Sequence, residues 1–177
     1  SRSQTTCARS LGKVSASHNP SRNLGGPDCV RLENTIFVTL VFKETVTFDD
    51  TIFHMSSLLR YLEMLVGRPQ NLLKLTLRIK SGDEMPVILQ VYWSMPPKRE
   101  PSFDKQKPHP SDVLLDAVRQ PEVFSRVLGN WLNRQKAWHD ARLRFSNSFA
   151  EQQHYGIDRL IGSANMYDIL PCSAVPP

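Results

Sequence analysis

The sequence predicts an α+β fold, in which a small antiparallel β-sheet with a packed helix is followed by a helical C-terminal segment. Residues 73–80 alternate strictly between apolar and polar side chains, and residues 86–95 resume the alternation after a turn. This period of two predicts a β-hairpin. Residues 52–66, and the chain from residue 111 onward, instead repeat apolar side chains at intervals of three and four. That spacing predicts amphipathic helices.

Length and charge limit the classes of protein. The 177 residues suffice for one ordinary domain or for a domain plus a fragment, and 40% of them are hydrophobic, which is enough for a core. The net charge of +5 arises mainly from residues 1–27, which hold four basic residues and no acid. The remaining chain is nearly neutral, so it lacks the electrostatic footprint of a nucleic-acid-binding domain.

The cysteines and the hydropathy pattern argue against several kinds of site. Cys7, Cys29 and Cys172 are odd in number and far apart, which fits neither a disulfide framework nor a zinc cluster. No run approaches the ~20 apolar residues of a membrane span, and no signal peptide is visible. We therefore expect a cytoplasmic chain with no metal, no cofactor and no membrane partner.

The first half of the chain contains three predicted segments in order. Residues 1–29 are aperiodic and rich in Ser, Asn, Gly and Pro, which predicts a disordered tail. Residues 35–43 are β-branched and aromatic with apolar residues at both parities, which predicts a strand covered on both faces. Asp49 or Asp50 is expected to cap the following helix, which Gly67 should end.

A Pro-rich segment separates the predicted β-containing module from the predicted helical region. Five prolines and four Lys or Arg fall within residues 96–110, which predicts an extended loop. The domain organisation that we predict has a disordered tail, a β-containing module, a Pro-rich linker and a helical region, at residues 1–29, 30–100, 101–110 and 111–177, respectively.

Two or three helices are predicted between the Pro-rich loop and the last helix. Ser111 or Asp112 should cap a short helix, and Pro121 suits the first turn of the next. From Asn133 to Ala150 the pattern either continues that helix or starts another.

The last predicted helix carries an apolar face without an obvious partner. It spans residues 155–170, and Pro171 ends it. Its middle is narrow enough to let another backbone approach. Asn165 flanks the face, and it either hydrogen-bonds across a helix pair or stays partly exposed. Because little chain follows, we expect the sequence to stop near the start of a helical domain. The apolar face comprises Ile157, Leu160, Ile161, Ala164 and Tyr167, and the narrow part comprises Gly162, Ser163 and Ala164.

Catalytic motifs are scarce. The sequence has no phosphate-binding loop, nucleophile elbow or zinc spacing. Arg134 and His139 are RNA or phosphate candidates, because a His can take a proton from a ribose 2′-hydroxyl while an Arg holds the phosphate. The alternative is a solvated helix face with Trp131 and Trp138 in the core.

Basic and aromatic side chains suggest two further surfaces. Arg142 and Arg144 with Trp138 could bind single-stranded nucleic acid, or the arginine stems could pack over apolar neighbours. Near the Pro-rich loop, a ligand surface is suggested by Tyr92, Trp93 and Phe103, although Trp93 also suits a core position.

Several segments resemble the bacterial ApeA-type HEPN proteins. The resemblance covers roughly residues 30–171 and is most specific at Tyr155-Gly-Ile-Asp-Arg-Leu-Ile-Gly-Ser-Ala-Asn-Met-Tyr-Asp-Ile-Leu-Pro171. In the family, a similar segment begins the first helix of the HEPN bundle. Trp138-His-Asp-Ala-Arg142, Tyr61-Leu-Glu-Met-Leu-Val-Gly-Arg-Pro-Gln70, the predicted hairpin and Val91-Tyr-Trp-Ser-Met95 are also similar. The positions that match the family motif are Asp158, Arg159, Gly162, Ala164, Asn165, Asp168 and Pro171, whereas Ser163 stands in place of Ala and Tyr167 in place of Phe.

The resemblance implies a two-part protein. Family members join an N-terminal β-containing module to a dimerising HEPN bundle, an RNA-cleaving toxin that shuts down the host in antiviral defence. Its catalytic motif, Arg and His separated by four to six residues, would lie after Pro177. Arg134 and His139 have a similar spacing but precede the bundle, so the resemblance assigns no catalytic residue to this chain.

Two functions follow as expectations. The first is a regulatory or sensing part of a HEPN-family defence ribonuclease of the abortive-infection type, with metal-independent cleavage only in the full-length protein. Its partners would be the rest of the bundle or a second subunit in a homodimer, RNA, and a phage-derived trigger. The alternative is a stand-alone ligand- or protein-binding β module without catalytic activity. An enzyme that uses Arg134 and His139 ranks below both.

Overall fold

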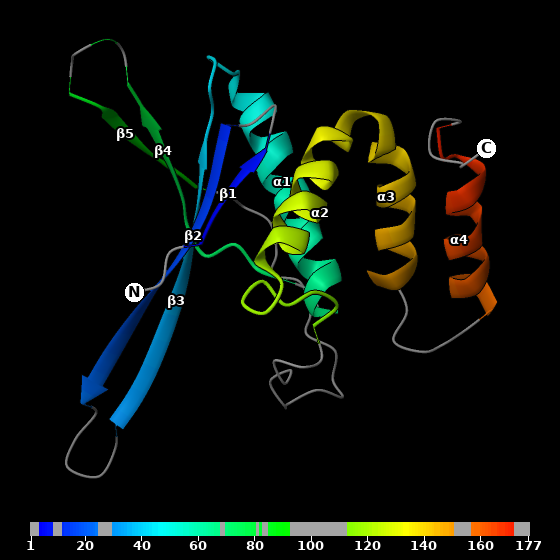
Figure 1. Cartoon of the computed structure of the whole chain (residues 1–177), viewed down its shortest axis with the longest axis horizontal. Coiled ribbons are helices and arrows are strands. Elements are labelled where there is room, and N and C mark those ends of the chain that lie inside the picture. Colours follow the sequence, from blue (N-terminus) through cyan, green and yellow to red (C-terminus); the bar gives the residue numbers. More distant parts are fainter. Residues whose placement is uncertain are drawn as a thin grey trace.

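The fold is α+β, as the sequence predicts. The computed structural model describes residues 4–8, 12–24, 30–67, 70–80, 82, 85–92, 113–150 and 157–171. Strands lie on one side, and four helices stand in a row on the other (Figure 1). The elements are β1 (Gln4–Ala8), β2 (Gly12–Leu24), β3 (Val30–Val41), α1 (Phe48–Val66), β4 (Leu75–Ile79), β5 (Val87–Val91), α2 (Pro121–Asn133), α3 (Gln135–Ala150) and α4 (Ile157–Asp168).

The first sheet corrects the prediction for the N-terminus. It is antiparallel in the order β1-β2-β3, and β2 pairs with β3 along its whole length. The predicted disordered tail, residues 1–29, is therefore wrong for residues 4–8 and 12–24, because backbone pairing of β2 with β3 and of β1 with β2 orders a segment of low hydrophobicity. Gly12 begins β2 with φ +80°, and an added Cβ there would lie 2.6 Å from the Val41 carbonyl oxygen.

Beyond β1, the strands β2 and β3 form a two-stranded ribbon that extends away from the helices (Figure 1). The predicted cover on both faces of β3 is wrong for the described residues, because Ile36 is 69% exposed and its neighbours Phe37 and Val38 are exposed as well. Among the described side chains of the ribbon, the apolar ones that pack on the core lie at its base, where Val14 is buried and Leu40 is partly buried.

The predicted hairpin is confirmed. β4 pairs antiparallel with β5 from Leu75 opposite Val91 to Ile79 opposite Val87. Leu75 and Leu77 are half-buried, while Ile79 and Val87 are exposed. Alternation therefore predicts the pairing correctly, and the inward face is covered over only part of its length.

Helix α1 ends where the sequence predicts and is capped by a different residue. Thr47 is the N-cap, and its Oγ1 accepts a 3.1 Å hydrogen bond from the Asp50 amide. Asp49 and Asp50 instead occupy the first turn, where acidic charge favours the helix dipole. Gly67 terminates the helix in the left-handed conformation, and its amide donates to the Glu63 carbonyl.

The short helix predicted from Ser111 or Asp112 is absent from residues 113–120, which form turns. Asp116 Oδ1 accepts from the amides of Val118 at 2.7 Å and Arg119 at 3.2 Å, and this local bonding competes with a helix. The two bonds also lower the pKa of Asp116. Pro121 then begins α2 as predicted, and a new helix, α3, starts after Arg134.

The core lies between α1, α2 and the base of β2. Leu58, Tyr61 and Leu65 supply the α1 side, and Leu128 and Leu132 supply the α2 side. The amide of Leu114 donates to the Leu65 carbonyl at 3.0 Å and so fixes the turn segment against the end of α1. This core positions the start of α3, which carries the polar groups described next.

Candidate functional site

A buried polar cluster joins α1 to α2 and α3. Ser57 is fully buried, and Gln135 and Arg142 are nearly so. Ser57 Oγ donates to Gln135 Oε1 at 2.5 Å, and Arg142 Nη1 donates to the same oxygen at 2.7 Å. Arg142 Nη1 also donates to the Trp131 carbonyl at 2.8 Å. Each of these buried polar side chains therefore has a hydrogen-bond partner, without which its burial would destabilise the fold.

The hydrogen bonds form a chain from Trp131 through Ser57 and Gln135 to His139, in which each side chain donates to the next. Trp131 Nε1 donates to Ser57 Oγ and to the Ser57 carbonyl, both at 3.0 Å. Because Gln135 Oε1 accepts from Ser57 and Arg142, its Nε2 is the donor that faces His139 Nδ1 at 3.5 Å. This arrangement favours the His139 tautomer with its proton on Nε2.

Arg142 lies between two tryptophan rings. Its Cζ is 3.7 Å from the centroid of the Trp131 ring and 5.7 Å from that of Trp138. Burial, followed by the nearby charge of Arg134, lowers the pKa of Arg142 to about 10. Arg142 nevertheless remains protonated at neutral pH, so the cluster holds a buried positive charge.

The two predicted RNA or phosphate candidates have different neighbours. The Cζ of exposed Arg134 lies 5.6 Å from the Trp138 centroid. His139 is half-buried, and its ring centroid lies 5.1 Å from that of Phe53. Each side chain is thus held by its own aromatic contact, and their joint action on RNA remains a prediction.

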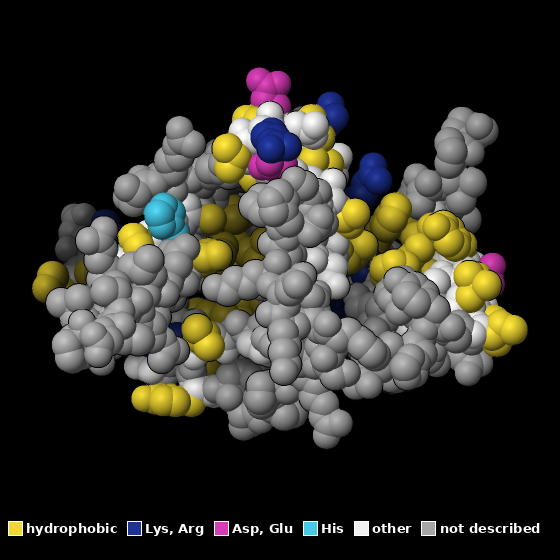
Figure 2. All heavy atoms as spheres, turned by 90° about the horizontal axis from the view of Figure 1, so that it is seen from below, with side chains coloured by type: hydrophobic (Ala, Val, Ile, Leu, Met, Phe, Trp, Pro, Cys, Tyr) yellow, Lys and Arg dark blue, Asp and Glu magenta, His cyan; other side chains and the backbone are white. Residues whose placement is uncertain are grey.

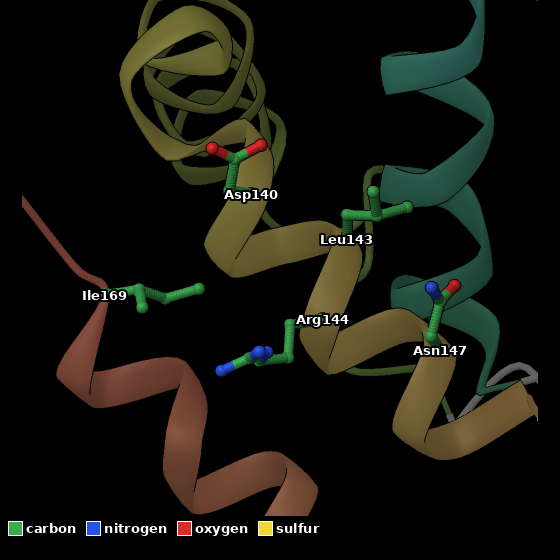
Figure 3. Close-up of a pocket in the computed structure, with 5 residues that line it drawn as sticks. All are labelled: Asp140, Leu143, Arg144, Asn147 and Ile169. Atoms are coloured by element: carbon green, nitrogen blue, oxygen red, sulfur yellow. The ribbon is translucent and has the colours of Figure 1, made fainter.

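A second feature is a shallow depression between α3 and the end of α4. Asp140, Leu143, Arg144 and Asn147 come from α3, and Ile169 closes the far side (Figure 3). The side chains of Arg144 and Ile169 point toward each other across the gap. The depression is open and has one acidic and one basic side chain at its rim. It therefore lacks the enclosed shape that holds a small substrate.

Helices α3 and α4 approach each other closely through small residues. A Cβ added to Gly162 would lie 2.8 Å from Ser148 Cβ, and Ser148 Oγ is 3.2 Å from Ser163 Oγ. The prediction that the narrow middle of this helix admits another backbone is confirmed. The apolar side of α4 is left open, and hydrophobic side chains gather at the right-hand edge of Figure 2, where α4 lies.

Comparison with known families decides the identity. The sequence profile described as ApeA N-terminal domain 1 matches residues 10–131, which is more than half of the chain. This chain belongs to the ApeA N-terminal domain family. Neither a curated protein nor a solved structure matches it. The ApeA domain associates the chain with defence-related ApeA proteins.

The ApeA match extends from the N-terminal strands into α2. It begins within the segment predicted as a disordered tail and passes beyond residue 100, where we predict the end of the β-containing module. The polar cluster straddles the end of the match, because Ser57 lies inside it and Gln135 and Arg142 follow it. Helix α4, with the HEPN-like positions, lies outside the matched residues.

The HEPN-like positions occupy α4 and the turn after it. Gly162 contacts α3, Ala164 is exposed and Asn165 is half-buried. Asp168 is the last residue of α4, and Pro171 comes three residues later. The side chains of Asp158 and Arg159 lie outside the described part of the structure.

The predicted ligand surface is described only at Tyr92. This side chain is 85% exposed after β5, and Trp93 and Phe103 lie outside the described residues. In the described ranges, no group of three or more His, Cys, Asp or Glu is placed to share a metal ion. No described helix has both the length and the apolar character needed to cross a membrane.

Sequence reasoning missed the roles of Ser57 and Gln135. Both are polar residues on helices, and neither belongs to a recognisable motif. The separation of 78 residues between them also hides their contact. A weak signal is Trp131, which needs a partner for its indole N–H once it is in a core.

Proposed function

We propose that this ApeA domain is the non-catalytic regulatory or sensing part of a HEPN-family defence ribonuclease of the abortive-infection type. Helix α4 would open its helical bundle. The observation that carries the proposal is the open apolar face of a helix that is already docked on α3. The sequence resemblance of α4 to the first HEPN helix supplies the identity of the bundle.

One side of α4 packs on α3, and another side is exposed. Gly162 and Ser163 face α3, whereas Ile157 is 73% exposed, Leu160 is 70% exposed and Tyr167 is also exposed. Burying such side chains stabilises an interface by about 25 cal/mol per Å² of apolar surface. We propose that further HEPN helices, from the same polypeptide or from a second subunit in a homodimer, cover this face.

The contacts of His139 and Arg134 support a structural role for the helices that carry them. His139 Nδ1 faces Gln135, and the Arg134 guanidinium lies against Trp138. A base and a phosphate-binding group that act on one ribose must converge on it. We propose that RNA cleavage belongs to groups outside this chain.

RNA cleavage by the 177-residue chain and by the natural full-length protein tests the division of labour. Both proteins are incubated with RNA in the presence of a metal chelator. We expect cleavage by the full-length protein alone. Cleavage by the 177-residue chain that disappears in His139→Ala, with folding retained, would overturn the proposal.

Exposed side chains on the two β-hairpins favour a second candidate, a protein-binding β module. Tyr92 follows β5, and Phe37 is exposed on the β2–β3 ribbon. If this surface senses a phage-derived trigger, Tyr92→Ser or Phe37→Ser in the full-length protein abolishes protection against phage while the fold is retained. Full protection in both variants would contradict this candidate.

A further inference from the structure

Two arginines share one indole ring at the corner between α2 and α3. The Cζ atoms of Arg134 and Arg142 lie 5.6 and 5.7 Å from the centroid of Trp138. Arg134 is exposed at the helix break, and Arg142 is only 7% exposed. The corner thus combines one accessible and one recessed guanidinium.

Neither positive charge has an acidic partner in the described ranges. No Asp or Glu described there lies within ion-pair distance of Arg134 or Arg142. Asp140, an acid of the same helix, lines the depression that faces α4. Burial lowers the pKa of Arg142, and the like charge of Arg134 lowers it further. A bound anion would relieve the repulsion between these like charges.

Two nitrogen donors of Arg142 make no hydrogen bond to the described residues. Its Nη1 donates to the Trp131 carbonyl and to Gln135, whereas Nε and Nη2 donate to no described residue. In the described part of the chain, the side-chain atoms that are fully buried without a partner are His54 Nδ1 and the Tyr61 hydroxyl. Nε and Nη2 of Arg142 therefore keep contact with solvent. This edge of a guanidinium matches two oxygens of a phosphoryl group.

We propose that the Nε–Nη2 edge of Arg142 and the guanidinium of Arg134 form a binding site for a phosphoryl group, beside Trp138. Gln135 and the Trp131 carbonyl hold Arg142 in place, so the recessed half of the site is built before the ligand arrives. Inorganic phosphate and a nucleoside monophosphate share the required chemistry. This site is independent of α4 and of the RNA-cleaving activity proposed above.

Titration of the full 177-residue chain with inorganic phosphate at constant ionic strength tests the site. The indole N–H resonance of Trp138 reports on binding, and that of Trp131, whose ring centroid lies 3.7 Å from Arg142 Cζ, should shift with it. We expect a saturable shift at Trp138. Arg134→Gln should weaken phosphate binding roughly tenfold, in the range of a charge-assisted hydrogen bond.

Arg126→Gln is the matched control, because Arg126 is an exposed arginine of α2 away from this corner. It should leave the phosphate affinity unchanged. Tighter binding of adenosine monophosphate than of phosphate identifies a nucleoside phosphate as the ligand, whereas equal affinity identifies a simple oxyanion. The absence of a saturable shift, or equal weakening by Arg134→Gln and Arg126→Gln, would overturn the proposal.

Discussion

At the scale of single residues, Gln135 connects α3 to α1. Its Oε1 accepts from both Ser57 and Arg142. Gln135→Leu fills a similar volume and leaves both donors without this acceptor. Since a lost bond to a charged donor costs about 1.5–3 kcal/mol, we expect the free energy of unfolding to fall by about 2–3 kcal/mol.

Urea denaturation measures this change in the free energy of unfolding. Lys136→Leu is the control, because it makes the same replacement at the next, exposed position of α3. An exposed substitution there should change the stability by less than about 0.5 kcal/mol. Equal effects of Gln135→Leu and Lys136→Leu would show that the cluster contributes nothing to stability.

His54 gives the fold a dependence on pH. Its Nδ1 is buried without a partner in the described region, and its ring lies near those of Phe42 and Phe53. Burial lowers the pKa of His54 below 6.5, and the charge of Asp50 opposes this only in part. The unfolded chain therefore binds the proton more readily, so stability is present above pH 6.5 and is lost as the pH falls below it.

We expect the urea midpoint to fall between pH 7.5 and pH 5.5, and His54→Leu to reduce that fall. The same decrease in His54→Leu as in the parent chain would assign the pH dependence to another group.

Sequence reasoning at this scale identified residue types better than contacts. Arg142 and Trp138 were recognisable as a basic and aromatic pair, and the structure places them together. Gln135 was not recognisable, because its importance comes from a serine on another helix. Contacts across such a distance in sequence leave no periodicity to detect.

At the scale of elements, the contact between α3 and α4 depends on a missing side chain. The Cβ of Gly162→Ala would overlap Ser148 Cβ at 2.8 Å. Alanine favours an isolated helix by about 1 kcal/mol, whereas forced overpacking costs about 1–3 kcal/mol. We expect α4 to separate from α3 in this variant, with faster amide hydrogen exchange in α4.

Ser148→Gly is the compensating change, because it removes the Cβ that clashes. The double variant should recover part of the protection in α4. If Gly162→Ala alone slows exchange, the two helices are farther apart than the structure shows.

Elements with a strong internal period were predicted best. The alternation in β4 and β5 and the apolar stripe of α1 are local signals, and both elements form. β1 and β2 have no such signal, because β2 is ordered mainly by its backbone ladder to β3. The turn at residues 113–120 was missed because the Asp116 side chain competes with the helix for backbone amides.

At the scale of the whole molecule, the described chain has one packed core and two open surfaces. The core lies between α1, α2 and the base of β2. The β2–β3 ribbon extends from one end of the molecule, and α4 forms the opposite end (Figure 1). We propose that the open apolar surface of α4 is a site of protein–protein contact. The family of the N-terminal part was predictable from resemblance, and a covering partner for α4 remains a proposal.

The most direct test of this account compares amide hydrogen exchange of α4 in the 177-residue chain with that in a full-length protein that carries the proposed HEPN helices. If HEPN helices cover the face of α4, its amides exchange at least roughly tenfold more slowly in the full-length protein, which corresponds to about 1.4 kcal/mol. Leu160→Lys in the full-length protein should remove that protection. Equal exchange of α4 in the two proteins would contradict the account.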